Sequence, residues 1–276
     1  MLIDLSENHD ISEKIVSLPN KIHPTALIAE GARLGSNVTV GPFSMIGEYV
    51  SIDNDTVIGA HVVIEGWTTI GKKNQIYTGA VIGSIPQDLK FNGEKSTVTI
   101  GDNNIIREYV TINRGTLGGG SATKLGDHNL LMTGCHVAHD VHMGSHNVIA
   151  NGVAIGGHVV VEDWVTIGGL VGIHQFCKIG KMSMIGGHTA IRQHVLPFSL
   201  VEGLPPKVYG VNLVRLRRNG YSVEARMLLQ KAYKIINRQG ITVPEISLEI
   251  RQKLPATDDI EYILNFLANT ERGIYR

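Results

Sequence analysis

Aliphatic residues recur at every sixth position along most of the chain. The first uninterrupted series comprises Ile22, Ile28, Leu34, Val40, Ile46, Ile52, Ile58, Ile64, Ile70, Ile76 and Ile82. After Ile100, Ile106 and Ile112, a last series comprises Leu125, Leu131, Val137, Met143, Ile149, Ile155, Val161, Ile167, Ile173, Ile179, Ile185 and Ile191. Because 43% of the residues are hydrophobic, twelve such matches in a row have a chance of about 4 in 100,000. Neither a helical nor a strand period explains this spacing.

A period of six is typical of a parallel β-helix, in which short strands wind into stacked coils and one aliphatic residue per strand fills the interior. Three hexads make one triangular coil, so residues 18 positions apart should lie above one another at the usual strand spacing of about 4.8 Å. We expect this architecture over residues 22–196. The pattern does not determine the handedness, although parallel crossovers in general are right-handed.

The remaining segments interrupt or flank this pattern. Residues 1–21 form a short lead-in whose structure the pattern does not predict. Residues 205–276 are predicted to form a smaller helical domain, because apolar residues lie there at helical intervals, namely Leu213, Leu216, Val223, Met227, Ile235, Ile260, Ile263, Leu264 and Leu267. Two insertions, near residues 84–97 and 115–124, should project from the β-helix as loops and help to build a binding surface. Gln87 and Lys90 in the first loop are therefore candidates for substrate contact.

Composition narrows the possible partners and the cellular location. The chain has 276 residues, with 25 basic and 25 acidic side chains, so it lacks the positive charge of a nucleic-acid or membrane-surface binder. Its two cysteines, Cys135 and Cys177, match no zinc or redox spacing and suit a reducing compartment. No apolar run is long enough to span a membrane, and the N-terminus does not resemble a secretion signal. We therefore expect a cytoplasmic protein without a membrane span.

Histidines are concentrated in the last third of the coils, and the stretch "CHVAHDVHMGSH" at residues 135–146 contains four of them. The 18-residue spacing places His139, Gly157 and Gln175 in one column. The adjacent column contains Asp140, His158 and Phe176. A histidine near its ordinary pKa can act as a general base, a carboxylate can fix its tautomer, and a glycine N–H can stabilise an oxyanion. This combination favours acyl transfer to a hydroxyl group.

Other interpretations of the histidines remain open. Histidines of neighbouring subunits bind zinc in gamma-type carbonic anhydrases, but His136, His139 and His142 should lie on different faces of the prism, so we expect no metal site. His128 and His146 are predicted to stack on one another as exposed corner residues. The remaining candidates for simple packing are His61, His188 and His194. A purely structural solenoid is a further alternative.

The chain resembles the UDP-N-acetylglucosamine O-acyltransferases that begin lipid A synthesis. The resemblance covers nearly the whole sequence, and it is carried by the strings "IHPTA", "QDLKF", "IREYVTINRGT", "NLLM", "HVAHD", "GGLVGIHQFC" and "GVNLVRLRR". Such enzymes have a left-handed β-helix, and this resemblance is the reason to expect left-handed winding. They act as homotrimers with clefts between adjacent prisms, and transfer a 3-hydroxyacyl chain from acyl carrier protein to the sugar 3-hydroxyl.

The resemblance also implies roles for particular residues. His139 would be the general base, Asp140 would orient it, and the Gly157 backbone would face the thioester oxygen. The nucleotide sugar and the pantetheine arm of the donor would contact Gln87, Lys90, His136, His158, Gln175, Asn212 and Arg218. No cofactor is expected beyond the phosphopantetheine thioester of the acyl donor.

The chain departs from the resembled enzymes at two places that affect substrate specificity, and a third position concerns acyl-chain length. The chain has "EGLPPKVYG" where these enzymes usually have an asparagine-led segment, and Val214 where a glutamate is common, which affects recognition of the ribose. The resemblance also implies that Gly187 lies at the position that limits acyl length in these enzymes, and its missing side chain predicts a long acyl chain, near fourteen carbons. An N-acyltransferase acting on a 3-amino sugar, or on the 3-O-acylated glucosamine, remains the alternative within catalysis.

Overall fold

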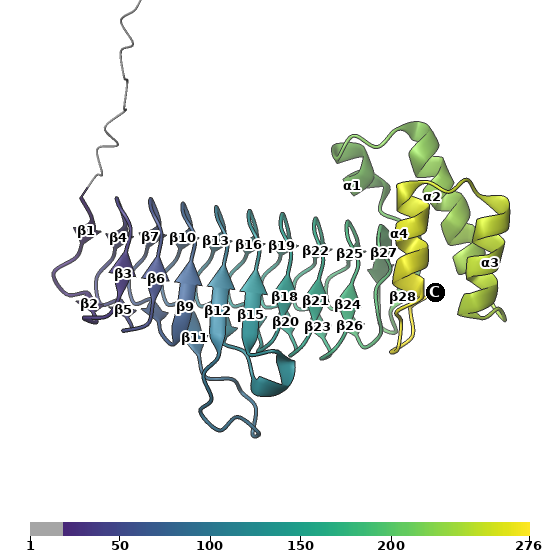
Figure 1. Ribbon diagram of the computed structural model, residues 1–276. Helices are drawn as coiled ribbons and strands as arrows, with labels where there is room; N and C mark the ends of the chain where they lie inside the picture. The colour runs from purple at the N-terminus through teal and green to yellow at the C-terminus, as the bar shows by residue number, and fades with distance from the viewer. Residues whose placement is uncertain (1–18) are drawn as a thin grey trace, which may run out of the picture.

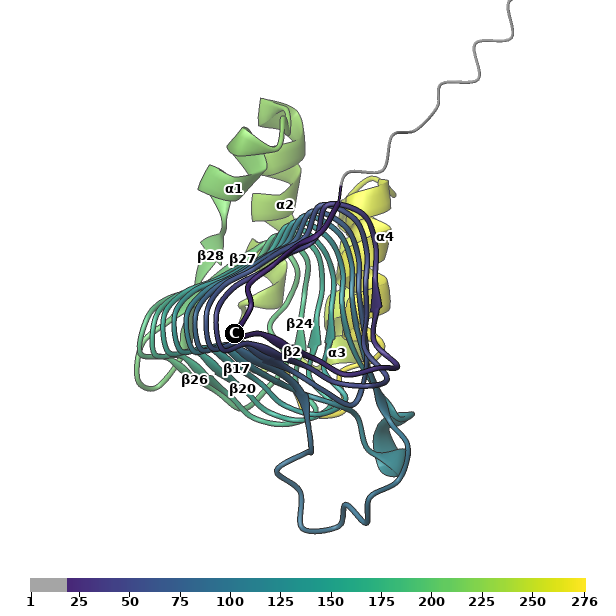
Figure 2. The same ribbon diagram turned by 90° about the vertical axis from the view of Figure 1, so that its left-hand side faces the viewer.

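The computed structural model describes residues 19–276, so most of the expected lead-in, residues 1–18, lies outside the described residues. The chain forms a long triangular prism followed by a small helical domain (Figure 1). Three parallel sheets make the sides of the prism, and the end-on view in Figure 2 shows its triangular outline. The winding is left-handed, so the predicted left-handed parallel β-helix is confirmed.

Each turn of the chain adds one strand to each sheet. The first sheet contains β1 Lys21–Ile22, β4 Thr39–Val40, β7 Val57–Ile58, β10 Gln75–Ile76, β13 Ile105–Ile106, β16 Leu130–Leu131, β19 Val148–Ile149, β22 Thr166–Ile167, β25 Met184–Ile185, β27 Ser199–Glu202 and β28 Lys207–Val211. The second sheet contains β2 Leu27–Ile28, β5 Met45–Ile46, β8 Val63–Ile64, β11 Val81–Ser84, β14 Thr111–Asn113, β17 His136–Val137, β20 Ala154–Ile155, β23 Gly172–Ile173 and β26 Ala190–Ile191. The third sheet contains β3 Arg33–Leu34, β6 Ser51–Ile52, β9 Trp67–Ile70, β12 Thr97–Ile100, β15 Ala122–Leu125, β18 His142–Met143, β21 Val160–Val161 and β24 Lys178–Ile179.

The aliphatic residues of the six-residue pattern fill the interior of the prism. Ile149, Ile155 and Ile167 have no exposed surface, whereas Met45, which precedes an inward-facing isoleucine, is 50% exposed. This alternation is that of a strand with one buried face. Parallel pairing of β20 with β23 sets Ala154 opposite Gly172, 18 positions further along the chain. The predicted coil length is therefore confirmed.

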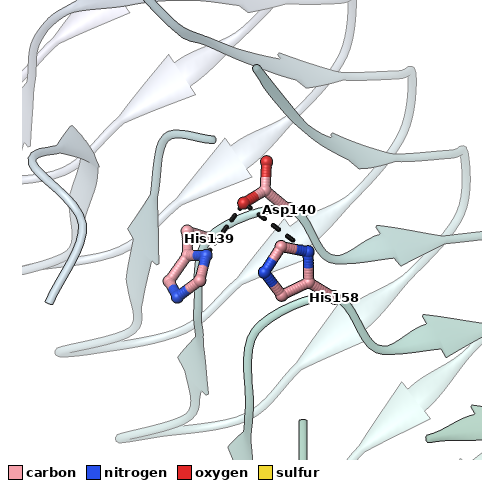
Figure 3. A group of neighbouring side chains, drawn as sticks. All are labelled: His139, Asp140 and His158. Atoms are coloured by element: carbon pink, nitrogen blue, oxygen red, sulfur yellow. Dashed lines mark hydrogen bonds and ion pairs between the residues drawn. The ribbon is translucent and has the colours of Figure 1, made fainter. Parts of the chain in front are cut away.

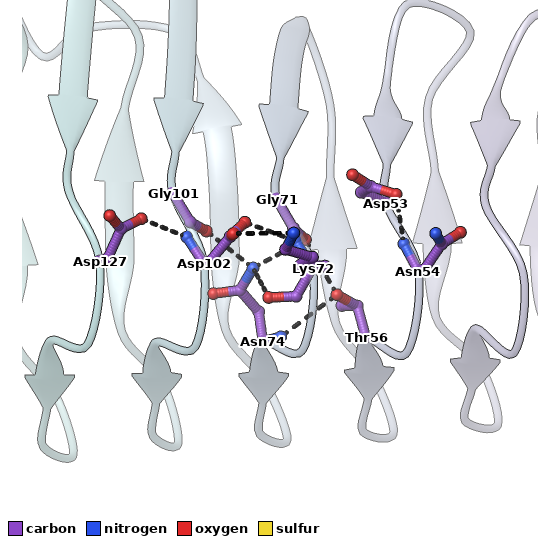
Figure 4. Close-up of polar contacts among 9 residues, drawn as sticks. All are labelled: Asp53, Asn54, Thr56, Gly71, Lys72, Asn74, Gly101, Asp102 and Asp127. Atoms are coloured by element: carbon purple, nitrogen blue, oxygen red, sulfur yellow. Dashed lines mark hydrogen bonds and ion pairs between the residues drawn. The ribbon is translucent and has the colours of Figure 1, made fainter.

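Polar side chains form hydrogen bonds with backbone groups at the corner between the third and first sheets (Figure 4). On the outside, the Lys72 N–H donates to Oδ1 of Asp102 at 2.9 Å, and the Asp102 N–H donates to Oδ1 of Asp127 at 2.6 Å. Inside the same corner, Asn74 is fully buried and its amide donates to the carbonyls of Gly71 and Gly101. Because a turn cannot pair its backbone within a sheet, these side chains supply the missing partners.

Both predicted loops are present and leave the prism at one corner. Thr97 of β12 pairs with Trp67, 30 positions earlier, and with Ala122, 25 positions later, so each loop is an insertion into an 18-residue coil. The first loop follows β11, and the second follows β14 and contains a short 3-10 helix, Leu117–Gly119. Figures 1 and 2 show that the two loops project side by side from the corner between the second and third sheets.

The C-terminal domain consists of four helices, namely α1 Leu213–Arg218, α2 Val223–Ile236, α3 Val243–Lys253 and α4 Asp258–Leu267. It differs from the prediction at its start, because β28 first returns antiparallel to β27 and extends the first sheet. The helical core continues into the last coil, where the Tyr233 hydroxyl donates to the Pro197 carbonyl. None of the helices between residues 19 and 276 has the length and apolar character needed to cross a membrane.

Candidate active site

The predicted column of site residues lies at the corner between the second and third sheets. This corner connects β17 to β18, β20 to β21 and β23 to β24 in successive coils. The His158 N–H donates to the His139 carbonyl at 3.1 Å, and the Phe176 N–H donates to the Gly157 carbonyl at 3.0 Å. The corner residues Asp140, His158 and Phe176 all adopt the left-handed backbone conformation that turns the chain. The predicted stacking of the two columns is therefore confirmed.

His139 and Asp140 form a hydrogen-bonded pair at this corner (Figure 3). Nδ1 of His139 lies 2.8 Å from Oδ2 of Asp140, whose side chain is 1% exposed. Because a carboxylate only accepts hydrogen bonds, the proton of the neutral imidazole is on Nδ1. Nε2 therefore carries the free lone pair, as a general base requires.

Gly157 faces the basic edge of this imidazole. A β-carbon at position 157 would lie 2.7 Å from Nε2 and 2.5 Å from Cε1 of His139, closer than real β-carbons approach other atoms. Any other residue would therefore displace the histidine. Gly157 is itself buried but lines the cavity, and its N–H has no acceptor among residues 19–276.

A cavity of about 560 Å³ lies beside the His139 imidazole. His139, Gly157 and Gln175 line it together with Gln87 from the first loop and His136 from β17. The strand positions that follow His136 at 18-residue intervals are small, and they comprise Ala154, Gly172 and Ala190. This column of small residues leaves room along the outer face of the second sheet for an extended, largely apolar ligand.

The two neighbouring histidines have environments that favour the neutral ring. Nδ1 of His136 lies 2.7 Å from the Thr111 hydroxyl, and burial lowers the pKa of His136, with a smaller contribution from His139. The ring of His158 stacks on Phe176 with centroids 4.4 Å apart. Burial also lowers the pKa of His158, although the nearby Asp140 opposes this shift. Both side chains can therefore accept and donate hydrogen bonds at neutral pH.

The other predicted site residues lie outside the cavity. Lys90 is exposed in the first loop, and Gly187 is exposed on the corner between the first and second sheets. Asn212 is 8% exposed and begins α1, where its Oδ1 accepts from the Arg215 N–H and its Nδ2 donates to the Met182 carbonyl. Arg218 is exposed at the end of α1, and Figure 2 shows that α1 lies on the side of the prism away from the two loops. A single chain does not bring Asn212 or Arg218 to His139.

The remaining histidine predictions have mixed outcomes. His128 and His146 stack with centroids 4.8 Å apart, as expected, and His146 stacks in turn on Trp164. His194 is buried beneath the C-terminal segment, where its Nδ1 accepts from the Lys178 N–H. His61 and His188 are exposed at corners, and His61 packs there on the ring of Phe43, with centroids 5.1 Å apart.

Sequence reasoning missed several residues at the site, among them His174 and Arg192, which line the cavity, and Thr116 and Thr123, which contact Asp140. Thr116, in the second loop, donates to Asp140 from both its backbone N–H and its hydroxyl. An 18-residue count cannot find this contact, because the loop adds seven residues to its coil. The only available signal was the glycine-rich stretch "GTLGGG", which allows the loop to pass close to another group.

His139, Asp140 and His158 could also hold a metal ion. One ligand atom from each lies within 4.8 Å of the others. Nδ1 of His139 and Nδ1 of His158 both face Oδ2 of Asp140, at 2.8 and 3.9 Å (Figure 3). The same oxygen already accepts the Thr116 hydroxyl at 2.6 Å, so the carboxylate serves here as a hydrogen-bond acceptor.

Two family models match this chain. The bacterial transferase hexapeptide model, of six repeats, matches residues 122–157, and the model of domain 2 of UDP N-acetylglucosamine O-acyltransferase matches residues 195–275. These matches, with the β-helix and the histidine site, define a hexapeptide-repeat acyltransferase.

Relatives identify the family within this class. The acyl-[acyl-carrier-protein]–UDP-N-acetylglucosamine O-acyltransferase of Aliarcobacter butzleri is 47% identical over 92% of this chain and 98% of that protein. The solved structure of LpxA from Acinetobacter baumannii has a TM-score of 0.90 and 41% identity, and covers 92% of this chain and 99% of that chain. LpxA from Moraxella catarrhalis has a TM-score of 0.89 and 39% identity at the same coverage. The chain therefore belongs to the UDP-N-acetylglucosamine O-acyltransferase family.

The histidine pKa values predict how stability depends on pH. Burial lowers the pKa values of His136, His158 and His194 below the ordinary 6.5. The unfolded chain then binds more protons than the folded chain below that pH, so stability should fall as the pH decreases from about 7.5 to about 5.5. Urea unfolding midpoints measured across this range should show the decrease. His136→Asn, whose Oδ1 can replace Nδ1, should flatten it, whereas the exposed His188→Asn should not; equal slopes in all three proteins would contradict the prediction.

Proposed function

We propose that this acyltransferase moves a 3-hydroxyacyl chain from acyl carrier protein to the 3-hydroxyl of UDP-N-acetylglucosamine, as the first step of lipid A synthesis. The acyl-carrier-protein donor and the UDP-sugar acceptor are those in the name of the Aliarcobacter butzleri relative. The observation that carries the mechanism is the direction of the His139 imidazole. Its Nδ1 is held by buried Asp140, while its Nε2 edge lies against Gly157 beside the cavity.

The chemistry follows from this arrangement. Nε2 of His139 takes the proton of the sugar hydroxyl as its oxygen attacks the thioester carbonyl. The free Gly157 N–H donates to the oxyanion that forms, and Asp140 stabilises the imidazolium. When the intermediate collapses, the carbon–sulfur bond breaks and the proton passes from His139 to the departing thiolate. The products are a 3-O-acyl sugar nucleotide and free carrier-protein thiol, and no other cofactor is required.

The substrates need room on both sides of His139. The column of Ala154, Gly172 and Ala190 offers a path for the pantetheine arm and acyl chain of the donor. Gln87, His136, His158 and Gln175 can hydrogen-bond the sugar, and Lys90 supplies a positive charge on the same loop as Gln87. The side chain of Val214 has no hydrogen-bonding group, so any side-chain hydrogen bond from α1 to the ribose would come from another residue.

We also propose that the active form is a homotrimer. α1, which follows Asn212 and contains Arg218, lies on the side of the prism away from the two loops (Figure 2), whereas His139 lies at the corner from which the loops project. A neighbouring copy would place its α1 beside this corner, so that the Arg218 guanidinium could bind the diphosphate. Each complete site would then combine residues of two chains.

Replacing the proposed base should abolish most of the activity. We expect His139→Ala to lower kcat by at least about 10²-fold, because a positioned base contributes about 10²- to 10⁴-fold. The protein would be incubated with UDP-N-acetylglucosamine and 3-hydroxymyristoyl carrier protein, and the product measured by mass spectrometry. His188→Ala, which removes an exposed corner histidine, is the matched control and should remain active. Near-normal turnover of His139→Ala would exclude the proposed role.

Acyl-chain length should depend on Gly187. We propose that the acyl chain runs past the exposed Gly187 in the assembled enzyme, so the unmodified protein should prefer acyl chains of roughly fourteen carbons and Gly187→Met should favour shorter chains by occupying that space. Competition among hydroxyacyl carrier proteins of different lengths would measure the preference, and an unchanged KM for the sugar nucleotide would show that the acceptor site is intact. A ten-carbon preference in the unmodified protein would contradict this expectation.

N-acylation is a second candidate because an amine could occupy the position of the 3-hydroxyl without any change at His139. Parallel reactions with UDP-N-acetylglucosamine, its 3-amino analogue and the 3-O-acylated glucosamine would separate the two activities. Predominant amide formation would favour the N-acyltransferase.

A zinc-dependent enzyme of the gamma-type carbonic anhydrase kind is a more distant candidate. It is supported by the grouping of His139, Asp140 and His158. We expect the purified protein to contain far less than one zinc per chain and to keep its acyltransferase activity in a chelator. Elemental analysis and activity after dialysis against the chelator would test this expectation. Stoichiometric zinc, lost together with activity, would favour the metal enzyme.

A further inference from the structure

The second loop encloses the carboxylate of Asp140. The Thr116 hydroxyl donates to Oδ2 at 2.6 Å, and the Thr116 N–H lies 2.9 Å from Oδ1 and 3.1 Å from Oδ2. Thr116 itself is 6% exposed. The side chain of Asp140 also lies against Gly119, where a β-carbon would lie only 2.0 Å from Cγ of Asp140. The glycine-rich sequence therefore lets the loop close tightly around this side chain.

These contacts define the orientation of Asp140. Thr123 also holds the main chain at this point, because its hydroxyl accepts from the Asp140 N–H at 2.8 Å. Oδ2 therefore lies between the Thr116 hydroxyl and Nδ1 of His139, at 2.6 and 2.8 Å. Any movement of Thr116 would change the direction in which the carboxylate accepts the hydrogen bond from the imidazole N–H.

The first loop is joined to this arrangement. Oε1 of Glu94 accepts from the Leu117 N–H at 3.2 Å, and Oε2 accepts from the Asn92 N–H at 2.9 Å. Hydrogen bonds from the backbone lower the pKa of the Glu94 carboxyl, so it is ionised at neutral pH. The loop that carries Gln87 is thus connected through Leu117 to the residue next to Thr116.

We infer that Thr116 is a positioning residue for acyl transfer, which acts through Asp140 on the His139 base. Its hydroxyl and N–H stabilise the charge of a buried carboxylate and aim Oδ2 at Nδ1. This inference rests on the proposed role of His139. Thr116 does not line the cavity, so its proposed effect is exerted through Asp140 and not through contact with a substrate bound there.

Thr116→Val removes the hydroxyl while keeping the shape of the side chain. We expect kcat to fall about tenfold or more with both KM values nearly unchanged, because only the alignment of the base is lost. Without the hydroxyl, more of the carboxylate charge acts on His139, so the acidic limb of the kcat/KM profile should move to higher pH by about half a unit or more. Thr116→Ser should restore both values towards those of the unmodified protein.

The control is Thr97→Val in the same coil. The Thr97 hydroxyl donates to the Ser121 carbonyl at the end of the same loop, at 3.3 Å, without contacting Asp140. This variant should lose a loop hydrogen bond but keep the pH profile. Circular dichroism and the unfolding midpoint would establish that each variant is folded, and Thr116→Ala would replace the valine variant if the latter does not fold.

The outcomes separate this inference from the proposed function. A normal kcat in Thr116→Val, a reduced kcat with an unmoved acidic limb, or equal effects of serine and valine would each overturn the positioning role. If His139→Ala is inactive while Thr116→Val behaves normally, only the inference about Thr116 fails. If His139→Ala remains active, the proposed general-base mechanism itself fails.

Discussion

The parallel register of 18 residues is the constraint on which the rest of the structure depends. Each coil pairs with the next through backbone hydrogen bonds at a strand spacing of about 4.8 Å, and Ile155 and Ile173 meet directly in this register. A shift by one residue would turn the isoleucines outward and their exposed neighbours, such as Met45, inward, so the buried pattern holds the register in place. The same register sets every corner side chain above its counterpart in the preceding coil.

The candidate active site lies at a single corner of the prism, where this stacking brings its residues together. Successive coils supply an imidazole at His139, a bare backbone at Gly157 and a carboxamide at Gln175, without any long-range folding of the chain. The insertions add what a regular coil cannot provide, because a loop can approach a corner from outside. Through this approach Thr116 buries Asp140, and Gln87 reaches the cavity.

The proposed catalytic residues lie on the prism, whereas the residues proposed to bind the nucleotide diphosphate lie on the helical domain. The corner that carries His139 faces away from α1, so in the proposed trimer a complete acceptor site would combine residues of two copies of the chain. A buried hydrogen-bonded carboxylate beside a partly exposed imidazole is well suited to proton transfer, since the pair is fixed before the substrates bind. The metal-binding interpretation requires the same carboxylate oxygen to exchange its hydrogen bonds for an ion.

The sequence by itself determined the coil, the three-sided core and the column of His139, Gly157 and Gln175, because a strict repeat converts sequence distance directly into spatial distance. It also predicted both loops and the helical end of the chain. Only the tertiary structure decided that β28 extends the first sheet, that Asn212 caps α1 and that Thr116 holds Asp140. These contacts join segments outside the repeat, where no period relates position in the chain to position in space.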